Sequence, residues 1–249
     1  MPSFCYLCGE PLAGKVPTNG DHCPPKGFFA PADRANFPII LPTHEACNYG
    51  WHKADELMSI VVDALHVKKK STNTILTQML NAKVVPFGQQ EATAISNVPL
   101  APIAARIVRA MHALLYNEFL PVTTKSKFHI PLPEEDSETQ SMLIPLEQSF
   151  IFSGVVRKAL ITKTADVVRA YNDKFKYACT WQKFDNGTPF CIICFDIYAF
   201  HTLSPPVSDF PTAFVGMYVP ERVPNCATYG SDIDIQLSQE ELLNPWRQI

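Results

Sequence analysis

Two short stretches decide the fold of the N-terminal region: CYLCG at residues 5–9 and HEACN at residues 44–48. Each stretch holds two potential metal ligands separated by two residues, which are Cys5 and Cys8 in the first and His44 and Cys47 in the second. Three thiolates and one imidazole make a closed tetrahedral zinc site. One such pair would be weak evidence, but two pairs predict a structural Zn²⁺ that joins the two stretches.

A second set of polar residues lies beside the predicted zinc ligands. Asp21 and His22 follow an Asn-Gly pair, a tight-turn signal that places them at the start of the second strand of a hairpin. If residues 47–65 form one helix, Asn48 and His52 are four apart and share a face. We therefore predict that Asp21, Asn48 and His52 bind a divalent ion, while His22 takes a proton from water because its imidazole titrates near neutral pH.

The other cysteines give weaker signals. Cys23 competes as a zinc ligand, but it stands between His22 and two prolines, and we expect it to pack as a small apolar residue. Cys191 and Cys194 form a second CxxC inside an apolar run. Residues three apart on a strand face opposite ways, so we expect this pair to lie in the core without sharing a metal.

Taken together, these motifs resemble the HNH endonuclease family, whose core is a ββα-metal module with a zinc knuckle. The likeness covers about residues 5–56 and consists of the CxxC pair, the Asp-His pair before two prolines, and a second ligand pair that ends in Cys-Asn. It implies hydrolysis of phosphodiester bonds of DNA, with His22 as general base and one divalent ion stabilising the leaving group. The implied ligands of this ion are Asp21, Asn48 and His52.

The implied catalytic ion is Mg²⁺ or Mn²⁺, although other divalent ions suit an O,O,N ligand set. The family often has cysteine at the position of His44 and histidine at that of Asn48. Its middle asparagine braces the loop that holds the base, and Asn36 is the candidate here. Asp55 and Glu56 have two interpretations, as groups that orient His52 or as ordinary surface charges.

Composition limits the class of protein. The chain has 249 residues, of which 47% are hydrophobic, and half of its eight cysteines cluster with histidines near one end. This favours metal binding in a reducing cytoplasm over a disulfide scaffold, and we expect no signal peptide and no membrane span. Because the formal net charge is −3, contact with nucleic acid must depend on local basic residues, for which the candidates are Lys26, Arg34, Lys68, Lys69, Lys70, Arg106 and Arg109.

The predicted fold class is α+β, with a zinc-stapled ββα-metal module in residues 1–83, a linker or packing arm in 84–102 and a mixed α+β domain in 103–249. Ile103, Ile107 and Met111 mark an amphipathic helix at the start of the last part. Strands are expected at 190–200 and 213–219, and a helix near 166–173. This last domain is the candidate for recognition of substrate, a protein partner or a second copy of the chain.

The sequence leaves three interpretations of the function. The first interpretation is a DNA endonuclease, and restriction of or defence against foreign DNA is its role by family association. The second is a ribonuclease with the same core. The third is a non-catalytic, zinc-stabilised binding module, which the acidic net charge favours. The pairing of Asp21-His22 with Asn48 and His52 favours an enzyme, because a purely structural zinc knuckle has no need for these residues.

Overall fold

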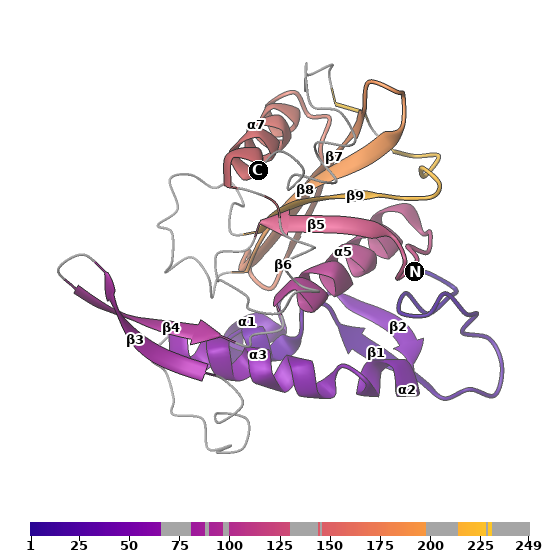
Figure 1. Ribbon diagram of the computed structural model, residues 1–249. Coiled ribbons are helices and arrows are strands. Elements are labelled where there is room, and N and C mark those ends of the chain that lie inside the picture. Colours follow the sequence, from indigo (N-terminus) through magenta and orange to yellow (C-terminus); the bar gives the residue numbers. More distant parts are fainter. Residues whose placement is uncertain are drawn as a thin grey trace.

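The computed structural model is of the mixed α+β class, as predicted (Figure 1). It describes residues 1–65, 81–87, 90–96, 100–129, 144, 146–197, 214–227 and 229–230. Its strands form a hairpin near the N-terminus, a second hairpin and a five-stranded sheet. None of the described helices combines the length and the apolar character needed to cross a membrane.

The N-terminal region is built on an antiparallel hairpin of β1 (Thr18–His22) and β2 (Ile40–His44), in which His22 pairs with Ile40. The tight turn expected at Asn19-Gly20 is wrong, because both residues pair within β1, and His22 ends the first strand of the hairpin. The loop between the strands carries the 3₁₀ helix η1 (Lys26–Phe28) and the short helix α1 (Pro31–Arg34). The helices α2 (Glu45–Tyr49) and α3 (His52–Leu65) follow directly after β2.

The single helix expected over residues 47–65 is therefore wrong, because the chain forms two helical segments. The amide of Gly50 donates to the carbonyl of Ala46 at 3.2 Å, which completes α2. The amide of Trp51 then donates to the carbonyl of Asn48 at 3.0 Å, three residues back. A three-residue turn is tighter than an α-helical one and rotates the residues that follow it, and glycine weakens a helix at this point.

The second part of the chain forms an antiparallel sheet with strand order β5-β9-β8-β7-β6. Its strands are β5 (Lys125–His129), β6 (Asp166–Ala170), β7 (Phe175–Lys183), β8 (Pro189–Ile197) and β9 (Phe214–Val219). Helix α5 (Leu100–Tyr116) lies between this sheet and the N-terminal hairpin, and α7 (Leu146–Ile161) covers the opposite face (Figure 1).

The central strand β8 alternates between two hydrophobic cores. Cys191, Ile193 and Phe195 belong to the core that also contains α5 and the N-terminal region, whereas Ile192 and Cys194 belong to the core under α7. This confirms that Cys191 and Cys194 are core residues on opposite faces of a strand. The larger core contains residues from both sides of the predicted linker.

Several predictions from the sequence concern single helices or strands and can be compared with the structure. The amphipathic helix from Ile103 and the strands near 190–200 and 213–219 are confirmed as α5, β8 and β9. The helix near 166–173 is wrong: that segment is β6, paired with β7, followed by a turn. Residues 84–102 include most of the hairpin of β3 (Asn81–Phe87) and β4 (Gln90–Ser96) and the start of α5. Lys68, Lys69 and Lys70 lie outside the described residues.

We predict that Phe152→Ala lowers the free energy of unfolding by about 3–5 kcal/mol, because Phe152 is fully buried between α7 and the sheet. The matched control is Phe150→Ala on the same helix, whose side chain is 69% exposed and whose loss should change stability by about 0.5 kcal/mol or less. Urea unfolding of both variants measures the difference. Equal losses would show that α7 does not pack on the sheet through this face.

Candidate functional site

The four predicted zinc ligands lie together. Cys5 and Cys8 come from a tight N-terminal turn in which Gly9, at φ +83°, donates its amide to the carbonyl of Cys5. His44 ends β2, and Cys47 lies in the short helix that follows. The four ligand atoms all lie within 4.8 Å of one another. The sequence therefore identified a real cluster.

The chemistry of this cluster fits a zinc ion. The two ring nitrogens of His44 have different neighbours: Nδ1 lies 3.4 Å from the sulfur of Cys8, and Nε2 lies 3.2 Å from the carbonyl oxygen of Pro11. A proton on Nε2 donated to that carbonyl leaves the lone pair of Nδ1 directed at the cluster. Burial, followed by the neighbouring sulfurs of Cys8 and Cys5, raises the pKa of Cys47 to about 12. Burial acts in the same direction on Cys5, but hydrogen bonds from the backbone and from Cys8 outweigh it and lower the pKa of that thiol. A bound cation would favour the thiolate form of both residues.

A pocket of about 560 Å³ lies beside the hairpin and helices of this region. It brings together all four residues that the sequence predicted for catalysis: Asp21, His22, Asn48 and His52. Two cationic side chains, Lys26 and Arg34, also line it, together with the acidic residues Glu45, Asp55 and Glu56. The pocket therefore combines titratable groups of both signs around the predicted base.

His22 ends β1 and is partly buried. Burial, reinforced by the positive charge of Lys26 and opposed by Asp21, lowers the pKa of its imidazole below the ordinary 6.5. The ring is therefore mostly neutral at pH 7, which is the protonation state that a general base requires.

Asn48 and His52 lie on the helical side of the pocket. The amide nitrogen of Asn48 donates to the side-chain oxygen of Asn19 at 3.1 Å, and the hydroxyl of Thr43 donates to the same oxygen at 3.1 Å. This bond uses one of the two N–H donors of Asn48 and orients its side-chain oxygen as the atom for a ligand. His52 is exposed, and its ring lies 6.2 Å from that of Tyr49.

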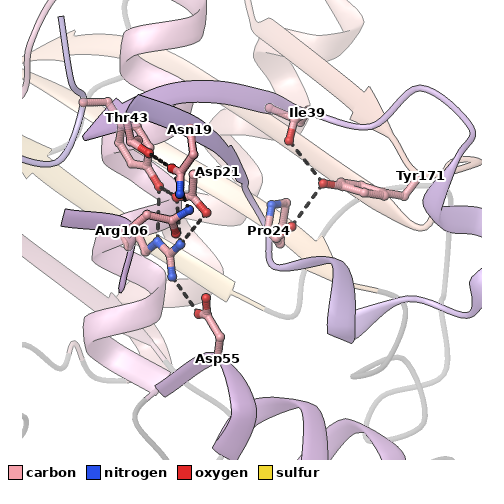
Figure 2. Close-up of polar contacts among 10 residues, drawn as sticks. Asn19, Asp21, Pro24, Ile39, Thr43, Asp55, Arg106 and Tyr171 are labelled. Carbon is pink, nitrogen blue, oxygen red and sulfur yellow. Dashed lines mark hydrogen bonds and ion pairs between the residues drawn. The ribbon is translucent and has the colours of Figure 1, made fainter. Parts of the chain in front are cut away.

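Asp21 has a different environment from the one expected of a metal ligand (Figure 2). Its carboxylate is 4% exposed, and both oxygens accept from Nη2 of Arg106 at 2.7 Å. The hydroxyl of Tyr6 also donates to this carboxylate. Because Arg106 already neutralises it, the carboxylate does not fit a divalent ion in this structure.

Arg106 links three elements. Its side chain is fully buried, Nη1 donates to Asp55 at 2.6 Å, and the guanidinium lies 4.9 Å from the ring centre of Trp51. The prediction that Arg106 contacts phosphates is wrong, because a fully buried guanidinium cannot reach one. From the sequence, Arg106 is expected outside the apolar stripe that Ile103, Ile107 and Met111 mark; this is wrong, because the helix buries Arg106 along with them.

The two predicted metal sites differ in whether their ligands lie close enough together to hold an ion. In the part of the chain that the structure describes, the Cys5, Cys8, His44 and Cys47 cluster is the group of three or more His, Cys, Asp or Glu side chains close enough to hold an ion. The acidic and imidazole groups of the pocket lie too far apart to form a second group of this kind. Asp55 pairs with Arg106 instead, and Cys23 is buried in the core, outside the cluster.

Comparisons of the chain with protein-family models, with curated proteins and with solved structures give no match. The functional inference for this chain therefore depends on its own residues and on their geometry.

We predict that the purified protein carries about one tightly bound zinc per chain, because a site of three thiolates and one imidazole binds zinc strongly. Cys5→Ser should lose the metal and lower the melting temperature. Cys226→Ser, at an exposed cysteine outside the cluster, should keep both. Elemental analysis and thermal unfolding measure these outcomes, and a folded, reduced protein free of zinc would remove the proposed metal.

We predict that Arg106→Met lowers the free energy of unfolding by about 3–5 kcal/mol, because it leaves the buried carboxylate of Asp21 without a cation. The double variant Asp21→Asn with Arg106→Met should recover part of this loss, since the uncompensated charge is gone.

The control for this experiment is Arg169→Met, which removes an exposed ion pair to Asp173 at 3.5 Å. Its effect should stay within about 0.5 kcal/mol, because solvent screens such pairs. Urea unfolding of the three variants tests the interpretation, which fails if Arg106→Met is as mild as Arg169→Met.

Proposed function

We propose that this chain is a phosphodiester hydrolase of the HNH class, in which the hairpin β1–β2 and the helices α2 and α3 form a ββα-metal module. One observation carries the proposal: the strand end and the two helices gather His22, Asn48 and His52 around one pocket, directly beside the Cys/His cluster. These residues come from three separate segments that a structural zinc knuckle has no reason to bring together.

His22 is the group proposed to activate water. Its neutral imidazole accepts a proton from the water, whose oxygen attacks the phosphorus while the bond to the leaving 3′ oxygen breaks. Lys26 and Arg34 line the same pocket and supply positive charge for the phosphate. Asn48 and His52 are the pocket donors proposed for the divalent ion of this class, and that ion would supply charge neutralisation at the phosphate. Asp21, as paired in the structure, is not among these donors.

DNA is the proposed substrate, and restriction of foreign DNA the proposed role. The lining residues are suited to the sugar–phosphate backbone, which carries no sequence information. Because the net charge is −3, binding should depend on the basic side of the pocket and weaken steeply with added salt. The alternative within this proposal is a ribonuclease with the same core. Comparing DNA and RNA as substrates distinguishes the two.

A second candidate function is a zinc-stabilised binding module without catalysis. The ion pair between Asp21 and Arg106 favours it, because a carboxylate neutralised by an internal guanidinium resembles a structural group more than a metal ligand. In this candidate the pocket would bind an anionic partner through Lys26 and Arg34 without hydrolysing it.

We predict that His22→Ala keeps the fold and the zinc content but lowers DNA cleavage by about 100-fold or more, the scale for loss of a positioned base. His129→Ala, a partly buried histidine on β5 far from the pocket in sequence, is the matched control and should cleave as wild type. Wild type and both variants are each incubated with supercoiled plasmid or with structured RNA, in EDTA, Mg²⁺ or Mn²⁺, and the cleavage rates are compared.

Cleavage by both variants at the wild-type rate would remove His22 from the mechanism. If wild-type protein binds plasmid but cleaves neither nucleic acid with any ion, the binding module replaces the nuclease. Faster cleavage of RNA than of plasmid would make the chain a ribonuclease.

A further inference from the structure

Tyr171 comes from the C-terminal sheet but contacts the loop that follows His22 (Figure 2). It stands directly after β6, and its hydroxyl lies 3.1 Å from the carbonyl oxygen of Pro24 and 3.2 Å from that of Ile39. Its ring stacks on Phe29 with centroids 4.0 Å apart and an interplanar angle of 5°. The side chain is fully buried, so these contacts are shielded from water.

The two carbonyls that Tyr171 contacts lie on either side of the candidate base. Pro24 is two residues after His22, and Ile39 directly precedes Ile40, the partner of His22 across the hairpin. The amide of Cys23 also donates to the carbonyl of Ile39, at 3.1 Å. One hydroxyl proton shared between both carbonyls thus fixes the open end of the hairpin at the position of His22.

The turn that presents Tyr171 has an unfavourable backbone. Tyr171, Asn172 and Asp173 have φ values of 52°, 56° and 59°, a left-handed conformation that side chains other than glycine rarely adopt. Such residues persist only where their surroundings hold them, and they gather at functional sites.

The loop between β1 and β2 holds this turn. The amides of Tyr171 and Asn172 donate to the carbonyls of Phe37 and Asn36, at 3.4 and 3.2 Å. The side chain of Asn172 donates to Asp33 at 3.1 Å and accepts from Asn36 at 3.3 Å. Asn36, the sequence candidate for a residue that braces the base, is therefore bound to the turn that carries Tyr171.

We propose that Tyr171 is a positioning residue for His22 and performs the bracing role that the sequence assigned to Asn36; this rests on the proposed function of His22 as base. His22 then lies between two neighbours anchored from the second part of the chain: Asp21 by Arg106, and Pro24 by Tyr171. On this proposal, the sheet and α5 as well as the hairpin itself fix the backbone on both sides of His22 and so orient its imidazole.

Tyr171→Phe tests this proposal, because it keeps the stacked ring and removes only the hydroxyl. We expect kcat for plasmid cleavage to fall about 10-fold or more, since small displacements of a catalytic group are costly. KM should stay unchanged, because Tyr171 is not among the residues that line the pocket. The ring signals of His22 in NMR spectra, assigned with His22→Ala, should shift.

The matched control is Tyr218→Phe, which also removes a fully buried hydroxyl, one that lies 3.0 Å from Nδ1 of His112. It should leave kcat and the His22 signals unchanged. A second variant is Asn172→Gly. Glycine adopts the left-handed backbone at this position without strain, so the variant removes only the side-chain bonds to Asp33 and Asn36. It should shift the His22 signals in the same direction as Tyr171→Phe, but less.

The proposal is overturned if the His22 signals are the same in Tyr171→Phe, Asn172→Gly and wild type, or if Tyr218→Phe lowers kcat as much as Tyr171→Phe does. Should wild-type protein cleave no nucleic acid, the proposed function fails, but the NMR comparison still decides whether Tyr171 positions His22. A shift in Tyr171→Phe without any cleavage would support positioning of a histidine that serves binding.

Discussion

The buried guanidinium of Arg106 is the interaction on which the arrangement of the two parts of the chain depends. A charge without access to water must be compensated where it lies, and the carboxylates of Asp21 and Asp55 provide that compensation from β1 and α3. Because the three charged groups belong to three elements, their ion pairs fix the position and orientation of α5 against β1 and α3. Apolar packing alone would specify this position less precisely.

The N-terminal region needs such external supports because it is small and rich in loops. Its helices and strands bury residues in the same core as α5 and one face of the sheet. Many apolar contacts of the N-terminal region are therefore made with the second part of the chain. The Cys/His cluster joins its first turn to the start of α2. Arg106 then holds the middle of the hairpin, and Tyr171 holds its open end.

This arrangement has a consequence for the pocket. Its basic and acidic residues lie on the same surface, and the acidic charge nearest to Arg106 is consumed internally. Arg106 compensates the charges of Asp21 and Asp55, while Glu45 and Glu56 line the pocket opposite Lys26 and Arg34. The ion pair with Arg106 removes Asp21 from the proposed ligands of a divalent ion, so Asn48 and His52 are the proposed ligands that remain.

The sequence by itself determined the local features. Ligand spacing identified the Cys/His cluster, the period of apolar residues identified α5, and the strand period placed Cys191 and Cys194 on opposite faces. Only the tertiary structure decided which partner each polar group meets. Asp21 is held by Arg106, 85 residues later, and Pro24 by Tyr171, 147 residues later. Such pairings depend on how distant segments pack, and local spacing carries no information about that packing.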